Sequence, residues 1–281
     1  MTAIPPRIGR RIVGAALRRY RQDLGYSLDD AARILDCDRS KISRIETGQR
    51  GIRNRELHHL LAEYGAGEQA RETLAKVANP PGIRDWWRAN AHNLPEAYAD
   101  MIVLEMTAPH IMVYETQQIP DLLQSAEYAH ALADACADLI PASLRQWITS
   151  ECLNRQETVL AEPRPEITVV IGEAALWHMP GGPTVTRAQL TALASVDSRF
   201  PEVRVQVLRS ENGAHAARAA GSFTILRYMP SLEVVYLRGI PGGTFVEDQR
   251  EIEGYASAFR QLTASALTPD ASATLIKQMQ R

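Results

Sequence analysis

The chain has 281 residues, more than one domain normally needs, so its length predicts two domains that each bury a core. With 45% hydrophobic and 23% charged residues, the composition excludes a disordered chain and a membrane-embedded one. The overall charge of −2 conceals a division, since residues 1–55 carry 13 Arg and Lys against 6 Asp and Glu, a net charge of +7. A basic end of this kind is typical of a segment that binds a polyanion.

The cysteine and histidine pattern indicates neither a disulfide framework nor a metal site. Cys37, Cys136 and Cys152 form no CxxC pair, and the adjacent His58 and His59 would point to different faces of a helix. The first residues lack the apolar segment of a signal peptide, and no stretch approaches 18 uninterrupted apolar residues. We therefore expect a cytoplasmic protein with no metal and no contact with a membrane.

Residues 9–78 read as five short helices. The apolar spacing of the first ends at Gly25, and Ser27 and Asp38 are good caps for the second and third. A fourth helix holds Leu57, Leu60 and Leu61, and a fifth begins near Glu68. The helix-breaking run Asn79-Pro80-Pro81-Gly82 then predicts the domain boundary.

Beyond the boundary the pattern mixes helices and strands. Helices are predicted over about 95–108, 125–138, 142–161, 186–198, 248–267 and 270–279, and strands over 167–171, 203–208, 222–228 and 233–238, with a further strand near 110–114. We expect an all-α five-helix helix-turn-helix domain over 1–80. An α+β domain with a mixed sheet of about four to five strands should follow over 81–281.

The segment from Ser27 to Arg50, SLDDAARILDCDRSKISRIETGQR, carries the strongest signal. A capped helix, a short turn and a second helix rich in Arg, Lys and Ser suit insertion into a major groove, where short polar side chains reach base edges. From Ile8 to about Tyr64 the chain resembles the repressor-type helix-turn-helix domains of the xenobiotic-response-element family. The charge run alone would also fit a solvated cationic surface.

The resemblance implies roles for individual residues. Arg39, Ser40, Ser43 and Arg44 match positions that face bases, and Lys41 matches one near the DNA backbone. Arg21 and Glu46 match a pair that ties the first helix to the end of the third, and residues 48–51 match a loop whose amides approach a phosphate.

Two positions depart from the family pattern. Asp36 stands where the turn glycine is usual, which is tolerable because Asp enters the left-handed region more easily than most residues. Leu28 replaces a glutamine that often clamps a phosphate. More of the backbone binding must then come from a set of arginines, namely Arg18, Arg19, Arg50, Arg53 and Arg55.

The second half resembles the C-terminal domain of a large actinobacterial regulator family. The matching motifs include Tyr114-Glu115-Thr116, the run from Ile119 to Ser125 and Val234-Val235-Tyr236-Leu237. That family's domain follows the same type of DNA-binding domain, and its members are described as antitoxin-like regulators that often lie beside a gene for a small partner protein. The resemblance therefore implies a domain arrangement and a neighbouring partner gene, but no particular chemical activity.

No hydrolase elbow, Walker loop, zinc-protease motif or dinucleotide fingerprint points to an enzyme or a cofactor. His215 with Glu173, Glu247 or Asp248 could form an acid–base pair, but a structural or partner-contact role fits this loop histidine better. Trp86 and Trp87 suit an interdomain packing anchor better than a ligand cage. Gly181-Gly182-Pro183 and Pro241-Gly242-Gly243 are expected to form only turns, since neither opens a helix in the way a phosphate loop does.

Together these patterns predict a homodimeric, nucleoid-associated transcriptional regulator that binds an inverted-repeat operator in double-stranded DNA. For the second domain three roles stay open: docking of a small partner protein, binding of a small-molecule effector, or dimerisation alone. Partner docking is the role we favour, with effector binding as the alternative.

Overall fold

The computed structural model describes residues 7–80, 95–139, 141–230, 232–239 and 242–280. The chain forms two compact units, Met1–Ala108 with Arg227–Glu233 and Pro109–Leu226 with Val234–Arg281. The predicted domain boundary near residue 80 stays a prediction, and Trp86 and Trp87 lie outside the described residues.

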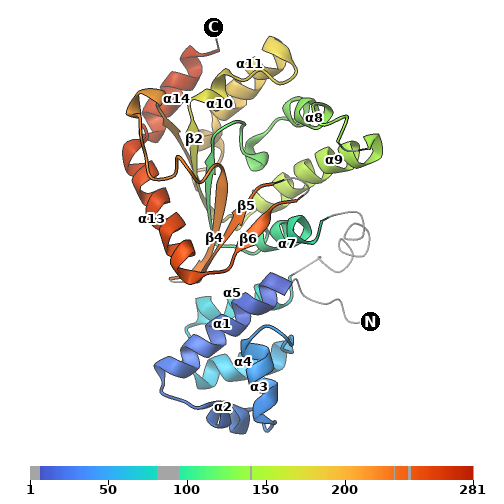
Figure 1. The fold of residues 1–281 in the computed structure, drawn as a ribbon, viewed down its shortest axis with the longest axis vertical. Helices are drawn as coiled ribbons and strands as arrows, with labels where there is room; N and C mark the ends of the chain where they lie inside the picture. The colour runs from blue at the N-terminus through green and yellow to red at the C-terminus, as the bar shows by residue number, and fades with distance from the viewer. Residues whose placement is uncertain (1–6, 81–94, 140, 231, 240–241, 281) are drawn as a thin grey trace. The chain divides into compact units, whose positions relative to one another are not determined.

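The first unit begins with the five helices that the sequence predicts (Figure 1). They are α1 (Arg7–Asp23), α2 (Leu28–Ile34), α3 (Arg39–Glu46), α4 (Asn54–Glu63) and α5 (Glu68–Ala78). Helix α7 (Glu96–Glu105) follows in the same unit. The apolar faces of the five helices form one core around Leu17, Ile42, Leu57, Leu61 and Leu74, each at most 1% exposed.

The turn between α2 and α3 depends on Asp36. Its φ of 45° lies in the left-handed region, and among the described residues Asp36 is the only one other than glycine with a positive φ. Asp tolerates this region better than most residues because its short polar side chain can hydrogen-bond locally. The geometry agrees with the interpretation of Asp36 as the residue at the turn-glycine position.

Gly14 sets the distance between α1 and the end of α3. A Cβ atom built on Gly14 would lie 2.4 Å from the Ile45 carbonyl oxygen and 2.7 Å from that of Glu46. These atoms belong to the backbone, so no side-chain rotation could relieve the clash. Only glycine allows the two helices to pack this closely.

The second unit is built on a six-stranded sheet in the order β3-β2-β1-β4-β5-β6. Its strands are β1 (His110–Glu115), β2 (Glu166–Gly172), β3 (Val203–Leu208), β4 (Phe223–Met229), β5 (Leu232–Leu237) and β6 (Thr244–Val246). Strands β1, β2 and β3 pair in parallel, and β5 pairs antiparallel with β6. The sheet is therefore mixed, as the sequence predicts.

The parallel strands are joined by helical crossovers, as parallel pairing requires. Between β1 and β2 lie the short 3-10 helix η2 (Asp121–Leu123), α8 (Ala126–Asp134) and α9 (Ala142–Val159). Between β2 and β3 lie α10 (Ala174–Trp177), α11 (Gly182–Leu193) and α12 (Val196–Arg199). A further 3-10 helix, η3 (Ser210–Asn212), begins the loop that leads from β3 to β4.

Helix α13 (Gln249–Ser265) covers one face of the sheet, on the opposite side from α8 and α9 in Figure 1. Its Ile252, Phe259 and Leu262 pack with Phe223 and Ile225 of β4 in one buried cluster. The segment that opens α14 (Pro269–Gln278) covers the edge strand β3: Ser272 Oγ accepts from the Val207 N–H at 2.9 Å, and the Leu267 N–H donates to the Val207 carbonyl at 2.9 Å. These bonds satisfy edge groups that could otherwise pair with another strand.

Two details differ from the sequence prediction. The three-residue strand β6 was not predicted, since a strand so short has no clear alternating pattern. The expectation that Gly181-Gly182-Pro183 forms only a turn was wrong: Gly181 is the N-cap of α11, and Pro183 lies in its first turn, where a missing N–H costs nothing. Within the described residues, no helix is both long and apolar enough to cross a bilayer.

We predict that Gly14→Ala destabilises the helical domain by about 2 kcal/mol or more, because the new methyl group must push the end of α3 away. Alanine is otherwise the better helix former, by about 1 kcal/mol. Gly9→Ala in the same helix is the matched control: its Cβ would meet nothing closer than 3.5 Å, so the change should be neutral or stabilising. Urea unfolding measures both, and equal effects of the two substitutions would contradict the close approach.

Candidate DNA interface

Side-chain caps define the start of α2 and of α3. Ser27 Oγ accepts from the Asp30 N–H at 3.2 Å, and the Asp30 carboxylate accepts from the Ser27 N–H at 2.7 Å. The bond from the Ser27 hydroxyl lowers the pKa of Asp30. Asp38 caps α3 by accepting from the Ser40 N–H at 2.7 Å. Both caps predicted from the sequence are present, and the Asp38 cap fixes the first turn of α3, where a groove-reading helix presents its side chains.

The candidate base-contacting residues lie on the outer side of α3. Arg39, Ser40 and Arg44 are exposed and Ser43 is partly buried. Arg39 Nη1 lies 3.7 Å from Asp29 Oδ2, with both side chains more than 60% exposed. The structure brings Ser40 and Arg44 together, since Arg44 Nε donates to the Ser40 carbonyl and Nη2 to Ser40 Oγ, each at 3.1 Å.

Lys41, predicted to lie near the DNA backbone, is tied to α4. Its Nζ donates to Glu56 Oε1 at 2.6 Å, and both side chains are largely buried. Burial has the largest single effect and would raise the pKa of Glu56, but the bonds from Lys41 and from the Arg53 N–H, with the charges of these two residues, together outweigh it and lower the pKa. A lysine held in this way fixes α3 against α4 and has less freedom to reach a phosphate.

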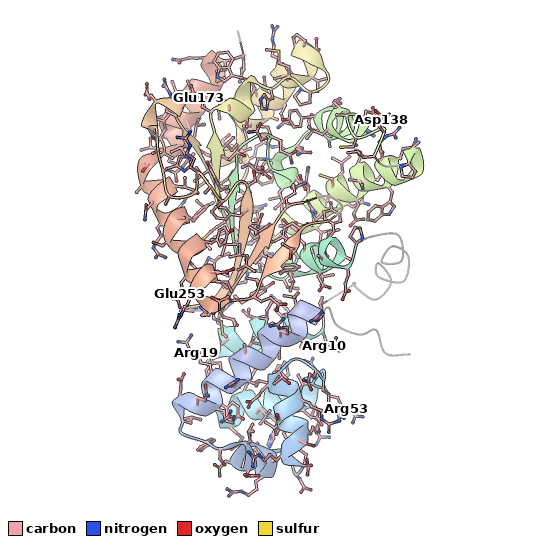
Figure 2. The ribbon with its side chains drawn as sticks, in the orientation of Figure 1. Arg10, Arg19, Arg53, Asp138, Glu173 and Glu253 are labelled. Atoms are coloured by element: carbon pink, nitrogen blue, oxygen red, sulfur yellow. The ribbon has the colours of Figure 1, made fainter. Side chains whose placement is uncertain are left out.

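The other candidate backbone cations do not share one surface. Arg18, Arg19, Arg50, Arg53 and Arg55 are all exposed, but Arg19 and Arg53 lie on different sides of the helical domain in Figure 2. Arg19 Nη1 also donates to the Pro230 carbonyl oxygen at 2.9 Å within the first compact unit. Arg53 is the N-cap residue of α4, and its N–H donates to Glu56 Oε2 at 3.4 Å.

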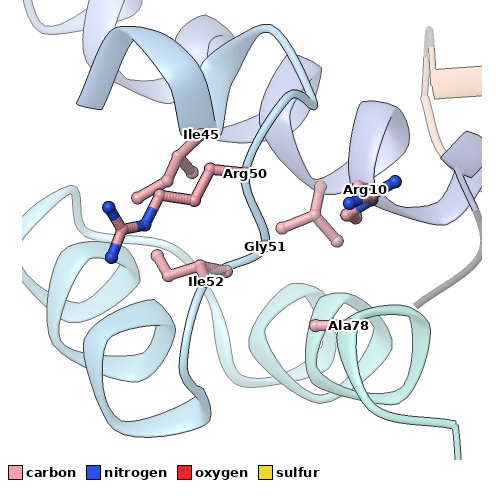
Figure 3. A pocket seen from close by; sticks show the side chains of 7 residues that line it. Arg10, Ile45, Arg50, Gly51, Ile52 and Ala78 are labelled. Atoms are coloured by element: carbon pink, nitrogen blue, oxygen red, sulfur yellow. The ribbon is translucent and has the colours of Figure 1, made fainter. Parts of the chain in front are cut away.

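The loop after α3 borders a shallow depression of about 250 Å³ of empty space that is open to solvent. Figure 3 shows Arg50 beside Ile45 and Ile52, with Arg10 on the other side of Gly51. Two amides of residues 48–51 are used within the fold, since the Gly48 N–H donates to the Ile45 carbonyl and the Arg50 N–H to the Arg44 carbonyl. These two amides are therefore poorly placed to bind the phosphate that the resemblance implies.

Arg21 and Glu46 form a buried bidentate ion pair between α1 and the end of α3. Arg21 Nε donates to Glu46 Oε1 at 2.7 Å and Nη2 donates to Oε2 at 2.8 Å, with the two side chains 10% and 5% exposed. Arg21 Nη1 also donates to the Tyr26 carbonyl at 2.7 Å. The bond to Glu46 raises the pKa of Arg21. One guanidinium thus connects α1, the approach to α2 and α3.

Sequence reasoning missed two residues that position α3. They are Gly14, which lets α1 approach the end of α3, and Glu56, which accepts from Lys41. Glu56 accepts from the Arg53 N–H three residues earlier, but an arginine at the N-cap carries no capping-box signal, because its side chain cannot accept a hydrogen bond. The pairing of Glu56 with Lys41, 15 residues away, leaves no local pattern.

A second group of charges lies where β1 ends in the second unit, and in it Glu115, Asp121 and Arg155 are largely buried whereas Arg238 is exposed. Asp121 Oδ2 accepts from Arg238 Nη2 at 2.6 Å and from Arg155 Nη2 at 3.0 Å, and Glu115 Oε1 lies 3.8 Å from Arg238 Nε. Burial would raise the pKa of Asp121, but the two arginines outweigh it and lower the pKa to about 2. Burial raises the pKa of Glu115. The group joins β1, η2, α9 and the end of β5.

Two of the acid–base partners considered for His215, Glu173 and Asp248, are engaged elsewhere. His215 Nε2 lies 3.4 Å from the Tyr114 hydroxyl. Glu173 accepts from the Ser210 N–H at 2.8 Å, and Asp248 caps α13 by accepting from two amides of its first turn. Among the described residues, no three His, Cys, Asp or Glu side chains gather where they could hold a metal ion.

We predict a strong coupling between Arg21 and Glu46. A double-mutant cycle with Arg21→Ala and Glu46→Ala should give an interaction energy of about 1–3 kcal/mol in urea unfolding, because both groups are buried and share two charge-assisted bonds. The exposed pair Arg19 and Asp23, 3.9 Å apart in α1, is the matched control and should give at most about 0.5 kcal/mol. Similar interaction energies for both pairs would argue against a specific connection of α1 to α3 through Arg21 and Glu46.

We predict that Asp121→Asn destabilises the protein by about 3 kcal/mol near pH 7. The folded-state pKa of Asp121, about 2, lies below its unfolded value, so the carboxylate stabilises the fold above about pH 4. This contribution falls as the pH drops from about 4 towards 2. The difference in unfolding free energy between wild type and variant should therefore shrink with acidification. Asp138→Asn, at an exposed site, should change stability by less than about 0.5 kcal/mol, and a pH-independent effect of Asp121→Asn would refute the charge argument.

Two family models match separate parts of the chain. Residues 12–74 match the model of a helix-turn-helix domain, which supports a DNA-binding regulator. Residues 98–278 match the model described as a domain of unknown function, DUF5753. Searches of curated proteins and of solved structures each gave no match. Because the second model covers more than half of the sequence, the chain belongs to the DUF5753 family, here preceded by a helix-turn-helix domain.

Proposed function

We propose that the protein is a sequence-specific transcriptional regulator of the xenobiotic-response-element type, whose helix α3 enters the major groove of an operator. One observation carries the proposal: α3 is capped at its start, held at Lys41 and Glu46, and leaves Arg39, Ser40 and Arg44 exposed on its outer side. A rigid helix with short polar and forked cationic side chains suits base recognition.

In this proposal the residues divide into two groups. Arg39, Ser43 and Arg44 face base edges, and Arg18, Arg50, Arg53 and Arg55 neutralise phosphates. Arg19 and Lys41 contribute less, because a carbonyl oxygen and a carboxylate already hold them. Phosphate contacts give affinity for any sequence, whereas base contacts give preference.

The protein acts as a homodimer on an inverted repeat. Helix α3 has eight residues, so one copy contacts few base pairs. In a dimer, binding of the first helix-turn-helix domain raises the effective concentration of the second at a half-site about one helical turn away. Two modest affinities are thereby combined into a higher one. The DUF5753 domain supplies the dimer contacts or the fixed spacing.

We further propose that the DUF5753 domain docks a small partner protein in an antitoxin-like manner. Trp177 and Met179, which are 63% and 55% exposed and separated by one residue in the chain, support a binding surface of this kind. A pull-down from the native cell, with and without nuclease, separates a protein partner from one bridged by DNA. A small-molecule effector is the alternative occupant of this domain.

Selection from a random DNA library, followed by salt titration of the selected site, tests the DNA-binding proposal. We predict an enriched inverted repeat bound by two copies of the chain, with an affinity that falls steeply between about 50 and 200 mM salt. Arg53→Ala should weaken all sequences alike and reduce the salt slope by about 1, and Arg39→Ala should relax preference at one position.

Arg187→Ala, at an exposed site on α11, is the control that should leave both affinity and slope unchanged. A library from which no sequence is enriched, together with binding that does not depend on salt, would exclude the proposed function.

A further inference from the structure

Ser40 and Arg44 were both predicted from the sequence to face bases, but their geometry indicates two different roles. Arg44 lies one helical turn after Ser40 on the outer side of α3. It donates from Nε to the Ser40 carbonyl oxygen and from Nη2 to Ser40 Oγ. Both bonds are 3.1 Å long, so the guanidinium is held against the first turn of the helix.

The two bonds to Ser40 use one edge of the Arg44 guanidinium and leave the N–H groups of its other edge free to bind. A guanidinium has five N–H groups in a fixed plane. Nε and Nη2 form the edge that faces Ser40. Nη1 and Nη2 form the second edge, where each nitrogen has one N–H directed away from Ser40. Two parallel donors at this spacing match the O6 and N7 acceptors of guanine, which are read by a bidentate arginine.

We propose that Ser40 is a positioning residue that orients the free edge of Arg44 toward one guanine of the operator, and that Ser40 itself contacts no base. This inference rests on the proposed DNA-binding function and assigns a base to one of its residues. It also revises the expectation that Ser40 reads a base directly.

The advantage of this arrangement is entropic. A free arginine on a helix surface samples many rotamers, and holding it in one before binding removes part of the cost of ordering it. Because the pair is exposed, its bonds contribute little to folding. The loss of the Ser40 hydroxyl should therefore appear in base preference and not in stability.

The test measures the base profile of five full-length variants, one of them a control, on the operator selected by the wild type. Arg44→Ala should abolish guanine preference at one position of each half-site. Ser40→Ala should reduce preference at that same position by about threefold to tenfold, as expected for the ordering of one flexible side chain, and leave binding to random DNA unchanged. Ser40→Thr keeps the hydroxyl and should restore the preference.

A double variant distinguishes a positioning role of Ser40, exerted through Arg44, from a merely structural one. In the Arg44→Ala background, Ser40→Ala should cause no further loss at that position, because it acts only through Arg44. Thr47→Ala, which removes an exposed hydroxyl at the other end of the same helix, is the matched control and should leave this position unchanged. Thermal unfolding should give the same midpoint for Ser40→Ala and the wild type.

Three results would overturn the inference: loss of preference at a different base pair in Ser40→Ala, additive losses in the double variant, or an equal loss of affinity for all sequences. The first two would indicate a base contact by Ser40, and the third a phosphate contact. If the wild type selects no sequence at all, the proposed function fails first, and that outcome is distinct from these three.

Discussion

The close packing of α1 against the end of α3 is the constraint on which the rest of the helical domain depends. At Gly14 the backbones approach until a Cβ would overlap two carbonyl oxygens of α3. Seven residues on, Arg21 lies on the same face of α1 and forms its two bonds to the carboxylate of Glu46. Glu46 thus meets α1 twice, through its backbone and through its side chain.

This double contact determines the orientation of α3 because the ion pair is buried. A buried pair gains little net stability over a hydrophobic one, since removing two charges from water is costly. A mispositioned α3, however, would leave both charges desolvated and unpaired, which costs several kcal/mol. The pair therefore penalises alternative orientations more than it stabilises the native one. The bond from Lys41 to Glu56 adds a second tether near the start of α3.

Most of the fold could be predicted from the sequence because its signals are local. Ser27 and Asp38 are followed by helices whose first amides they cap, and the alternation of Val203 to Leu208 marks a buried strand. The site was harder to predict because it depends on pairs distant in the chain. Lys41 carries a charge that suits a phosphate, and nothing in its neighbourhood reveals Glu56. Ser40 and Arg44 have the right spacing for contact, but spacing does not say which edge of the guanidinium stays free.

The strength of each internal contact decides which cations are available to DNA. The pair of Arg39 and Asp29 is exposed and 3.7 Å apart, so breaking it costs at most about 1 kcal/mol. Lys41 would give up a 2.6 Å bond to a largely buried carboxylate and leave Glu56 without that partner, which costs more. An approaching phosphate also repels Asp29 and Glu56, but only Asp29 is free to turn away into solvent. The helical domain thus has two kinds of cation. Lys41 is held in place and positions α3, whereas Arg39 can exchange its carboxylate partner for a phosphate.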